Sequence, residues 1–297
     1  MRWAAIRIAV DDVGSPGSAA TAASELLMSA GSAGVANDIG AHDEITAVIG
    51  YLPEDERLAP KLRQVNTALT LLPSLGIGGV SGEAVVTLIE EEDWATAWKQ
   101  FFKPLRVGRR LVVTPPWEAP DLAPGDHALV IDPGMAFGTG AHATTRLCLA
   151  ALEDYLNSDE IRRVADIGTG SGILAIAAKK LGAQYVLATD VDPLAVRIAR
   201  RNAGANEVVI DARNAADADS PLQQPFDLLV ANILAGTLIE LAGEFAGAVR
   251  PGGIYIASGI IEERENDVRF YTEAEGFQPL ETRREGEWVA LVFRRLA

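Results

Sequence analysis

Three glycines in the segment ADIGTGSGILA are spaced to bring a ligand close to the protein backbone. Gly168, Gly170 and Gly172 lie between an expected strand, RRVADI, and an expected helix, ILAIAAKKL. Glycines in this place permit a tight turn and the close approach of a ligand to a helix N-terminus. A dinucleotide fingerprint also requires Gly or Ala at the sixth position from Gly168, which is Ile173 here. The motif argues against a nicotinamide-dependent oxidoreductase, and a purely structural turn is the other alternative.

Two acidic residues beside these glycines favour S-adenosylmethionine as the cofactor. Asp166, two residues before Gly168, can hold the ammonium of an amino-acid moiety directly or through water, whereas its charge would repel phosphates. Asp190 ends the next expected strand, YVLATD, where it can accept hydrogen bonds from both ribose hydroxyls. An acid at a strand end can instead be only a helix cap, but Asp192 is already the expected N-cap of the following helix.

Asn232 is the candidate catalytic residue. It ends the expected strand FDLLVAN, beside the crevice in which such sheets bind ligands. Its amide oxygen and the backbone carbonyls that follow can accept hydrogen bonds from a nucleophilic amine. Many amino-methyltransferases have Asn-Pro-Pro-aromatic here, whereas this chain has Asn-Ile-Leu-Ala. The missing aromatic residue argues against flipped nucleic-acid bases, which need a stacking wall.

The glycine-rich segment DPGMAFGTGAH, residues 132–142, is predicted to cover the cofactor. It cannot be aligned with a phosphate loop, and it precedes an expected helix, ATTRLCLAALEDYL. We expect Phe137 to lie over the cofactor and Thr145 to donate or accept a hydrogen bond near its methionine end. His142 is interpreted as a packing or capping residue in preference to a catalytic base. The spacing of the three histidines does not suit zinc, so no metal site is expected.

Two domains are expected to position these residues. Strands alternate with helices from about Ala128, which predicts an α/β, doubly wound, Rossmann-like sheet over residues 127–297. Its expected elements include a strand at VVI, one helix over Thr237–Val249 and a terminal hairpin that adds an antiparallel strand. Residues 1–92 read as strand, helix, strand, strand, helix and strand, the order of a small ferredoxin-like α+β domain.

Residues 93–126 are expected to connect the domains through a helix, Asp93–Pro104, and a hairpin. Trp94, Trp98 and Phe101 share one face of that helix, and basic residues flank them. Such a segment can bind nucleic acid, but a buried aromatic face with a solvated basic edge is the interpretation we favour. No direct nucleic-acid binding is therefore expected. Pro104 and Gly108 are candidate hinges.

Composition limits the class of protein. The 297 residues are 48% hydrophobic, which is typical of a globular chain, and the single cysteine cannot form an internal disulfide. With one cysteine, no signal peptide and no apolar run of roughly 20 residues, we expect a cytoplasmic protein that is not in a membrane. A monomer is the oligomeric state that we expect. The net charge of −15 suits a basic partner, although it can also serve solubility alone.

Together these motifs resemble the PrmA family, the bacterial methyltransferases of ribosomal protein L-eleven (L11). The matching segments run in order from about Asp93 and include DWATAWKQFFKPLRVGRRL, DPGMAFGTGAHATTRLCLAAL, VADIGTGSGILAIAAKKLGA, DLLVANILAG and GEWVALVFRR. The resemblance implies a methyltransferase domain over residues 127–297 that binds S-adenosylmethionine through Thr145, Gly168, Asp190 and Asn232. It also implies that residues 1–92 recognise L11, with lysine ε-amines and an N-terminal α-amine as methyl acceptors. Another protein or a small amine is the alternative substrate.

Overall fold

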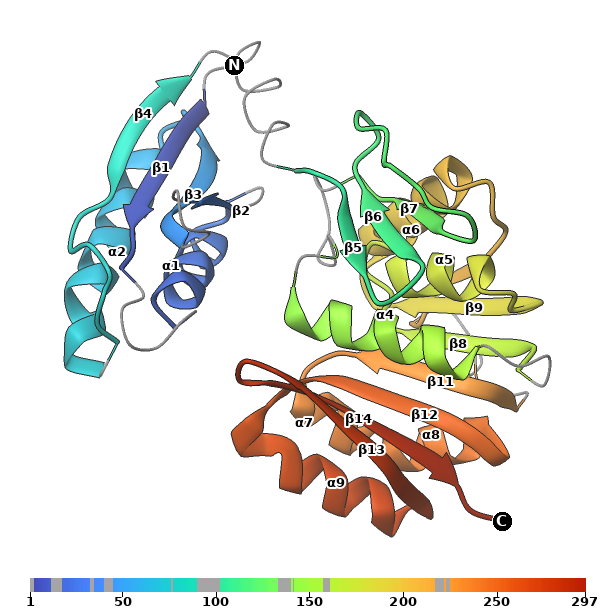
Figure 1. The fold of residues 1–297 in the computed structure, drawn as a ribbon. Helices are drawn as coiled ribbons and strands as arrows, with labels where there is room; N and C mark the ends of the chain where they lie inside the picture. The colour runs from blue at the N-terminus through green and yellow to red at the C-terminus, as the bar shows by residue number, and fades with distance from the viewer. Residues whose placement is uncertain are drawn as a thin grey trace. The chain divides into compact units, whose positions relative to one another are not determined.

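The computed structural model describes residues 3–11, 18–32, 35–39, 45–75, 77–89, 102–132, 140, 142–156, 161–216, 222 and 225–297. The chain divides into two compact units, Met1–Lys103 and Pro104–Ala297 (Figure 1). The expected connector, residues 93–126, is thus divided between the two units. The expected helix Asp93–Pro104 falls almost wholly outside the described residues.

The first unit is a four-stranded antiparallel sheet with the strand order β2-β3-β1-β4. Its elements are β1 Trp3–Ala9, α1 Ser18–Ser29, β2 Val35–Ile39, β3 Ile45–Pro53, α2 Leu58–Leu71, a 3-10 helix Leu72–Leu75 and β4 Val85–Ile89. Ile6 and Ile8 alternate with outward residues along β1 and pack with Leu27 of α1 and Leu69 of α2. Both helices therefore cover one face of the sheet, and the predicted ferredoxin-like order is confirmed.

The second unit is built on a seven-stranded sheet with the order β10-β9-β8-β11-β12-β14-β13. Its strands are β8 Arg163–Ile167, β9 Tyr185–Asp190, β10 Asp211–Asn214, β11 Phe226–Asn232, β12 Val249–Ile261, β13 Phe277–Glu285 and β14 Trp288–Arg295. The first five of these are parallel, β14 is antiparallel to β12, and β13 is antiparallel to β14. This arrangement confirms the predicted doubly wound sheet with its terminal hairpin.

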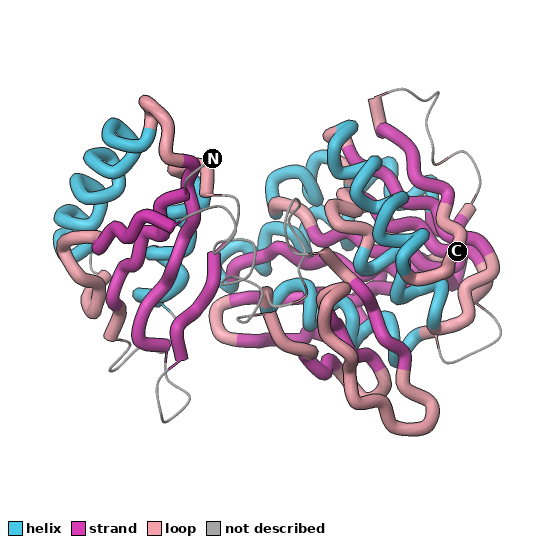
Figure 2. Tube along the Cα trace, turned by 90° about the horizontal axis from the view of Figure 1, so that it is seen from above, coloured by secondary structure: helices cyan, strands magenta, loops and turns pink. Residues whose placement is uncertain are grey.

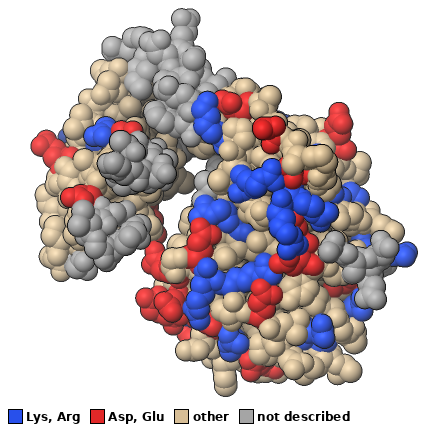
Figure 3. Space-filling model, viewed as in Figure 1, with Lys and Arg blue, Asp and Glu red and all other residues tan. Residues whose placement is uncertain are grey.

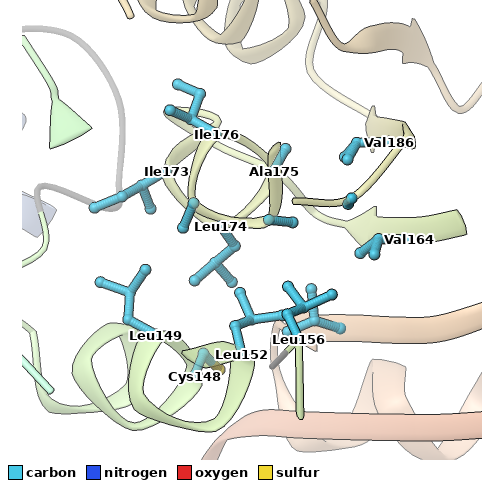
Figure 4. Close-up of a cluster of buried hydrophobic side chains, with 14 of the residues drawn as sticks. Cys148, Leu149, Leu152, Leu156, Val164, Ile173, Leu174, Ala175, Ile176 and Val186 are labelled. Carbon is cyan, nitrogen blue, oxygen red and sulfur yellow. The ribbon is translucent and has the colours of Figure 1, made fainter. Parts of the chain in front are cut away.

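Helices cover both faces of this sheet. They are α4 Ala143–Tyr155, α5 Ile173–Lys180, α6 Pro193–Ala205, α7 Ala235–Glu240, α8 Ala242–Ala248 and α9 Glu265–Ala274. On one face α4, α5 and α6 close an apolar cluster in which Leu149 and Leu152 of α4 meet Leu174 of α5 (Figure 4). On the other face α7, α8 and α9 close a second cluster around Phe245 and Tyr255. Figure 2 shows the strands and helices of this unit from above. Because β8, β9, β10, β11 and β12 are parallel, their carboxyl ends lie at one edge of the sheet.

A separate three-stranded sheet precedes the large one. It consists of β5 Leu105–Val107, β6 Leu111–Thr114 and β7 His127–Val130, in the order β5-β6-β7. The strands β5 and β6 form the expected hairpin, whereas β7 runs parallel to β6. The hairpin therefore belongs structurally with the unit that follows it.

Two expected elements of the second unit were wrong in detail. The segment VVI is not a strand, because pairing with β9 begins only at Asp211, and Val209 is 84% exposed. The chain turns at Glu207, whose φ is 57°, and these apolar residues only lead back to the sheet. The expected single helix over 237–249 is two, α7 and α8, which meet at Leu241. Gly243 and Gly247 lower the helix propensity of this apolar stretch, which its periodicity alone did not reveal.

Candidate active site

The residues expected to bind the cofactor lie at the carboxyl edge of the large sheet. Gly168 directly follows β8, Asp190 ends β9 and Asn232 ends β11, and these three parallel strands lie in the order β9-β8-β11. Open α/β sheets bind their ligands at this edge. Thr145, in the first turn of α4, lies beside Asn232 at this edge.

The fold itself requires glycine in the turn after β8, whether or not a ligand is bound there. Gly168 has φ +73°, and a Cβ atom on it would lie 2.2 Å from Cγ2 of Ile233. Its N–H and that of Thr169 both donate to the carbonyl oxygen of Thr189, at 2.8 and 2.9 Å. The structural and ligand-binding interpretations of the motif are therefore compatible.

Asp190 ties the glycine turn to the second strand. Its Oδ2 accepts from the N–H of Gly170 at 2.9 Å, and its Oδ1 accepts from the N–H of Asp192 at 3.0 Å. Asp192 is a separate cap, because its side chain accepts from the N–H of Leu194 at the start of α6. The prediction for Asp192 is confirmed. Each Asp190 oxygen has a further lone pair, so the partly exposed carboxylate can still accept from ribose hydroxyls.

Asp166 is fully buried beneath the same turn and has an oxygen that lacks a partner. Its Oδ2 accepts from the Thr169 hydroxyl at 2.7 Å and from the N–H of Ala175 at 3.1 Å. Its Oδ1 has no hydrogen-bond partner among the described residues. Burial raises the pKa of this carboxyl to about 7, and the nearby Asp190 charge adds to the effect. A buried carboxylate oxygen that has no partner is the kind of acceptor that a ligand ammonium needs.

Thr145 and Asn232 meet across the site. Asn232 Nδ2 donates to the hydroxyl oxygen of Thr145 at 3.4 Å, and Thr145 is only 1% exposed. This contact joins the first turn of α4 to the end of β11. With its nitrogen facing Thr145, the Asn232 amide can present its oxygen to an incoming amine.

His142 caps the helix that carries Thr145. Its side chain accepts from the N–H of Thr144 at 3.3 Å, and its ring meets the ring of Trp288 edge-on, with the centroids 4.8 Å apart. Burial, and secondarily Arg146, lower the pKa of His142, which favours the neutral ring that such a cap needs. The interpretation of His142 as a capping and packing residue agrees with this geometry.

The terminal hairpin contributes residues to this region that the sequence did not connect with it. Besides Trp288 of β14, Glu285 of β13 forms an ion pair with Arg146, one turn along α4 from His142. The motif GEWVALVFRR was visible in the sequence, but no residue in it was given a role. Phe137 lies outside the described residues, so its position over the cofactor stays a prediction. Among the described residues no group of three or more His, Cys, Asp or Glu could hold a metal ion.

A profile of the family described as ribosomal protein L11 methyltransferase (PrmA) matches residues 3–296. The chain belongs to this family. A PrmA relative from Pelobacter propionicus is 43% identical over 263 residues, covering 86% of this chain and 85% of its own length. Another from Symbiobacterium thermophilum is 46% identical over 249 residues, covering 84% and 81%.

A solved PrmA-type structure agrees with these matches. The crystal structure of a ribosomal protein L11 methylase from Lactobacillus delbrueckii subsp. bulgaricus is 35% identical, with a TM-score of 0.59. The match covers 66% of this chain and 100% of the Lactobacillus chain. The resemblance seen in the sequence is confirmed, and the chain is an S-adenosylmethionine-dependent methyltransferase. The buried Asp166 oxygen and the glycine turn fit that cofactor.

Replacing Asp190 with alanine is expected to weaken the cofactor more than it slows methyl transfer. The lost hydrogen bonds are charge-assisted, so the cofactor's Kd should rise by a factor that corresponds to roughly 1.5–3 kcal/mol. Calorimetry and turnover at saturating cofactor measure the two effects separately. Asp192→Ala is the matched control, since it removes only a helix cap, about 1 kcal/mol of stability. Unchanged affinity in Asp190→Ala would show that Asp190 is structural.

Asp166→Asn is expected to change how stability depends on pH. Because the folded pKa of about 7 exceeds the ordinary 3.8, the folded protein binds more protons between these values. Without cofactor, its free energy of unfolding should therefore fall as pH rises through this window. The asparagine variant lacks this penalty, so it should gain stability relative to the parent from pH 5 to pH 8. Urea unfolding at both pH values measures the difference, and a difference that is constant with pH contradicts the raised pKa.

Proposed function

We propose that this protein transfers methyl groups from S-adenosylmethionine to lysine ε-amines and the N-terminal α-amine of ribosomal protein L11. The observation that carries the proposal is the Asn232–Thr145 contact, at 3.4 Å, beside the cofactor turn. In this proposal the contact keeps the amide oxygen of Asn232 turned toward the approaching amine. The relatives' names, which specify ribosomal protein L11, support the choice of substrate.

When bound, S-adenosylmethionine supplies a methyl group on a sulfonium centre to a nucleophile that attacks in line. The amine must arrive neutral, and neutralising a lysine of pKa ~10.4 near pH 7.4 costs about 4 kcal/mol. Partial desolvation at the site lowers that cost. We assign no general base, since His142 already accepts a hydrogen bond from the N–H of Thr144. The proton leaves to water before the amine docks, and Asn232 then orients the nitrogen lone pair.

The remaining roles follow from the same scheme. Thr145, Gly168, Gly170 and Asp190 bind the cofactor, and Phe137 covers it. Residues 1–92 recognise the substrate, and their 13 Asp and Glu against 5 Lys and Arg suit a basic protein. We propose residues 1–92 as the recognition domain and residues 127–297 as the methyltransferase domain, with the hairpin that connects them packed as part of the second unit.

We also propose that the protein does not bind nucleic acid directly. On the face shown in Figure 3, Lys and Arg of the second unit lie beside Asp and Glu. Arg106 pairs with Asp126 at 2.5 Å and Arg109 with Asp154 at 2.7 Å, so the hairpin's positive charges are offset.

In the part of the chain that the structure describes, every helix is too short or too polar to span a membrane. We propose a monomer that works in the cytoplasm on a ribosomal protein.

A labelling experiment tests the substrate. The protein is incubated with methyl-labelled S-adenosylmethionine and dissociated ribosomal proteins, and the labelled band is identified by mass spectrometry. We expect label on L11, at lysine side chains and at the N-terminus. Label on a different protein, or only on small amines, would support the alternative substrates instead.

A further inference from the structure

Glu153 is a buried carboxylate on α4 that the methyl-transfer scheme does not use. Glu153 is 1% exposed, and its carboxylate accepts three hydrogen bonds from the turn between β5 and β6. The N–H of Arg109 donates to Oε2 at 2.6 Å, and the N–H of Arg110 donates to Oε1 at 2.7 Å. The Arg110 guanidinium adds a contact to Oε1 at 3.3 Å. Acidic side chains are seldom buried to this extent unless they are paired, so the turn and the carboxylate depend on each other.

The turn is shaped to receive this carboxylate. Gly108 has φ +66°, and a Cβ atom on it would lie 2.4 Å from Oε2 of Glu153. Any other residue at this position would push the carboxylate away from the two N–H groups. We call the contact between the Glu153 carboxylate and the turn at residues 108–110 the anchor. Gly108 belongs to the anchor, which contradicts its expected use as a hinge.

The anchor lies close to the residue at which the second unit begins. The second unit begins at Pro104, and the β5–β6 hairpin is its first element, so the first unit is tethered there. Thr145 lies eight residues before Glu153 on the same helix, about 12 Å along its axis. One rigid helix thus joins the tether point of the first unit to the Thr145–Asn232 pair.

We propose that Glu153 is a positioning residue that fixes the tether of the substrate-recognition unit to the helix that carries Thr145. The inference rests on the proposed function, in which the first unit holds L11 while an amine enters the active site. Fixing the hairpin gives the tether a constant starting point relative to Asn232. Loosening it should impair the delivery of a tethered protein substrate but spare the chemistry on a free amine.

The neighbouring Asp154 provides a matched control. It also pairs with the hairpin, through Arg109 at 2.7 Å, and with Arg283 of β13 at 2.8 Å. Its side chain is 37% exposed, however, against 2% for Glu153. Exposed ion pairs contribute little to stability, so removing this charge should leave the hairpin in place.

Steady-state kinetics on the full chain, with L11 and with a short lysine peptide, test the proposal. In Glu153→Gln we expect KM for L11 to rise roughly ten-fold, which corresponds to ~1.4 kcal/mol. Cofactor affinity and turnover of the peptide should stay within about two-fold of the parent values. Gly108→Ala should behave alike, because its methyl group displaces the carboxylate, and it serves if Glu153→Gln does not fold. Asp154→Asn should stay close to the parent in every parameter.

Amide hydrogen exchange tests the anchor itself. The amides of Arg109 and Arg110 should be protected in the parent and in Asp154→Asn, and should exchange faster in Glu153→Gln. Fast exchange in the parent would overturn the anchor. An unchanged KM for L11 in both Glu153→Gln and Gly108→Ala would overturn its role in delivery, as would a proportional loss of all activities and of folded protein. If the parent does not methylate L11 but shows the expected exchange pattern, the proposed function fails and the anchor stands.

Discussion

Asn232→Ala is expected to lower turnover at saturating cofactor by roughly 100-fold while the protein stays folded, because the amine loses the group that orients it. The side chain is partly exposed and contacts Thr145 through one hydrogen bond at 3.4 Å, so its removal should cost little stability. Turnover is measured with L11 at saturating cofactor, and folding by thermal unfolding. The KM for L11 should change far less than turnover.

Thr145→Val is the companion to this variant. It keeps the volume of the side chain but removes the hydroxyl that the Asn232 amide faces. With the amide free to flip, we expect a smaller loss of turnover than in Asn232→Ala. Near-normal turnover in Asn232→Ala would remove this residue from the mechanism.

Removing the first unit should separate cofactor binding from substrate recognition. A chain that starts at Pro104 keeps both apolar clusters of the second unit intact, since these contain only residues from Val107 onward. We therefore expect it to fold and to bind S-adenosylmethionine almost normally. Its methylation of L11 should fall by more than about ten-fold, because it lacks the acidic unit that we propose as the recognition surface. Calorimetry and the labelling assay measure the two properties.

Salt supplies a second measurement of the same idea. Attraction between an acidic recognition unit and a basic protein is screened over roughly 8 Å at physiological ionic strength. The full chain should thus lose L11 methylation as salt rises, whereas methylation of a short lysine peptide should depend on salt much less. If the shortened chain methylates L11 as well as the full chain does, the first unit is not the recognition element.

Local patterns were sufficient to predict most of the fold. The alternation of apolar residues along β1 and the cap at Asp192 are each determined by neighbours in the sequence. The same holds for the candidate site residues at strand ends, Gly168, Asp190 and Asn232, because parallel strands bring their carboxyl ends together.

Contacts between distant parts of the chain could not be predicted in this way. Glu153 meets a turn more than 40 residues earlier, and His142 meets Trp288 from the terminal hairpin. Neither pair has a local signature, because a buried carboxylate and a ring on a ring depend on tertiary packing. The break at Leu241 was missed for a different, local reason: the apolar period continues through it and hides the low helix propensity of Gly243 and Gly247.

The place of β14 within the large sheet has a consequence for the order in which the protein can be made. Although β14 comes after all the other described strands, it lies between β12 and β13 and pairs with both. Until residues up to Arg295 have been synthesised, β13 has no neighbour and Trp288 cannot reach His142. The four described strands of the first unit end at Ile89, so that unit can fold while translation continues. A nascent chain should therefore fold its first unit early and acquire methyltransferase activity only after β14 has been made.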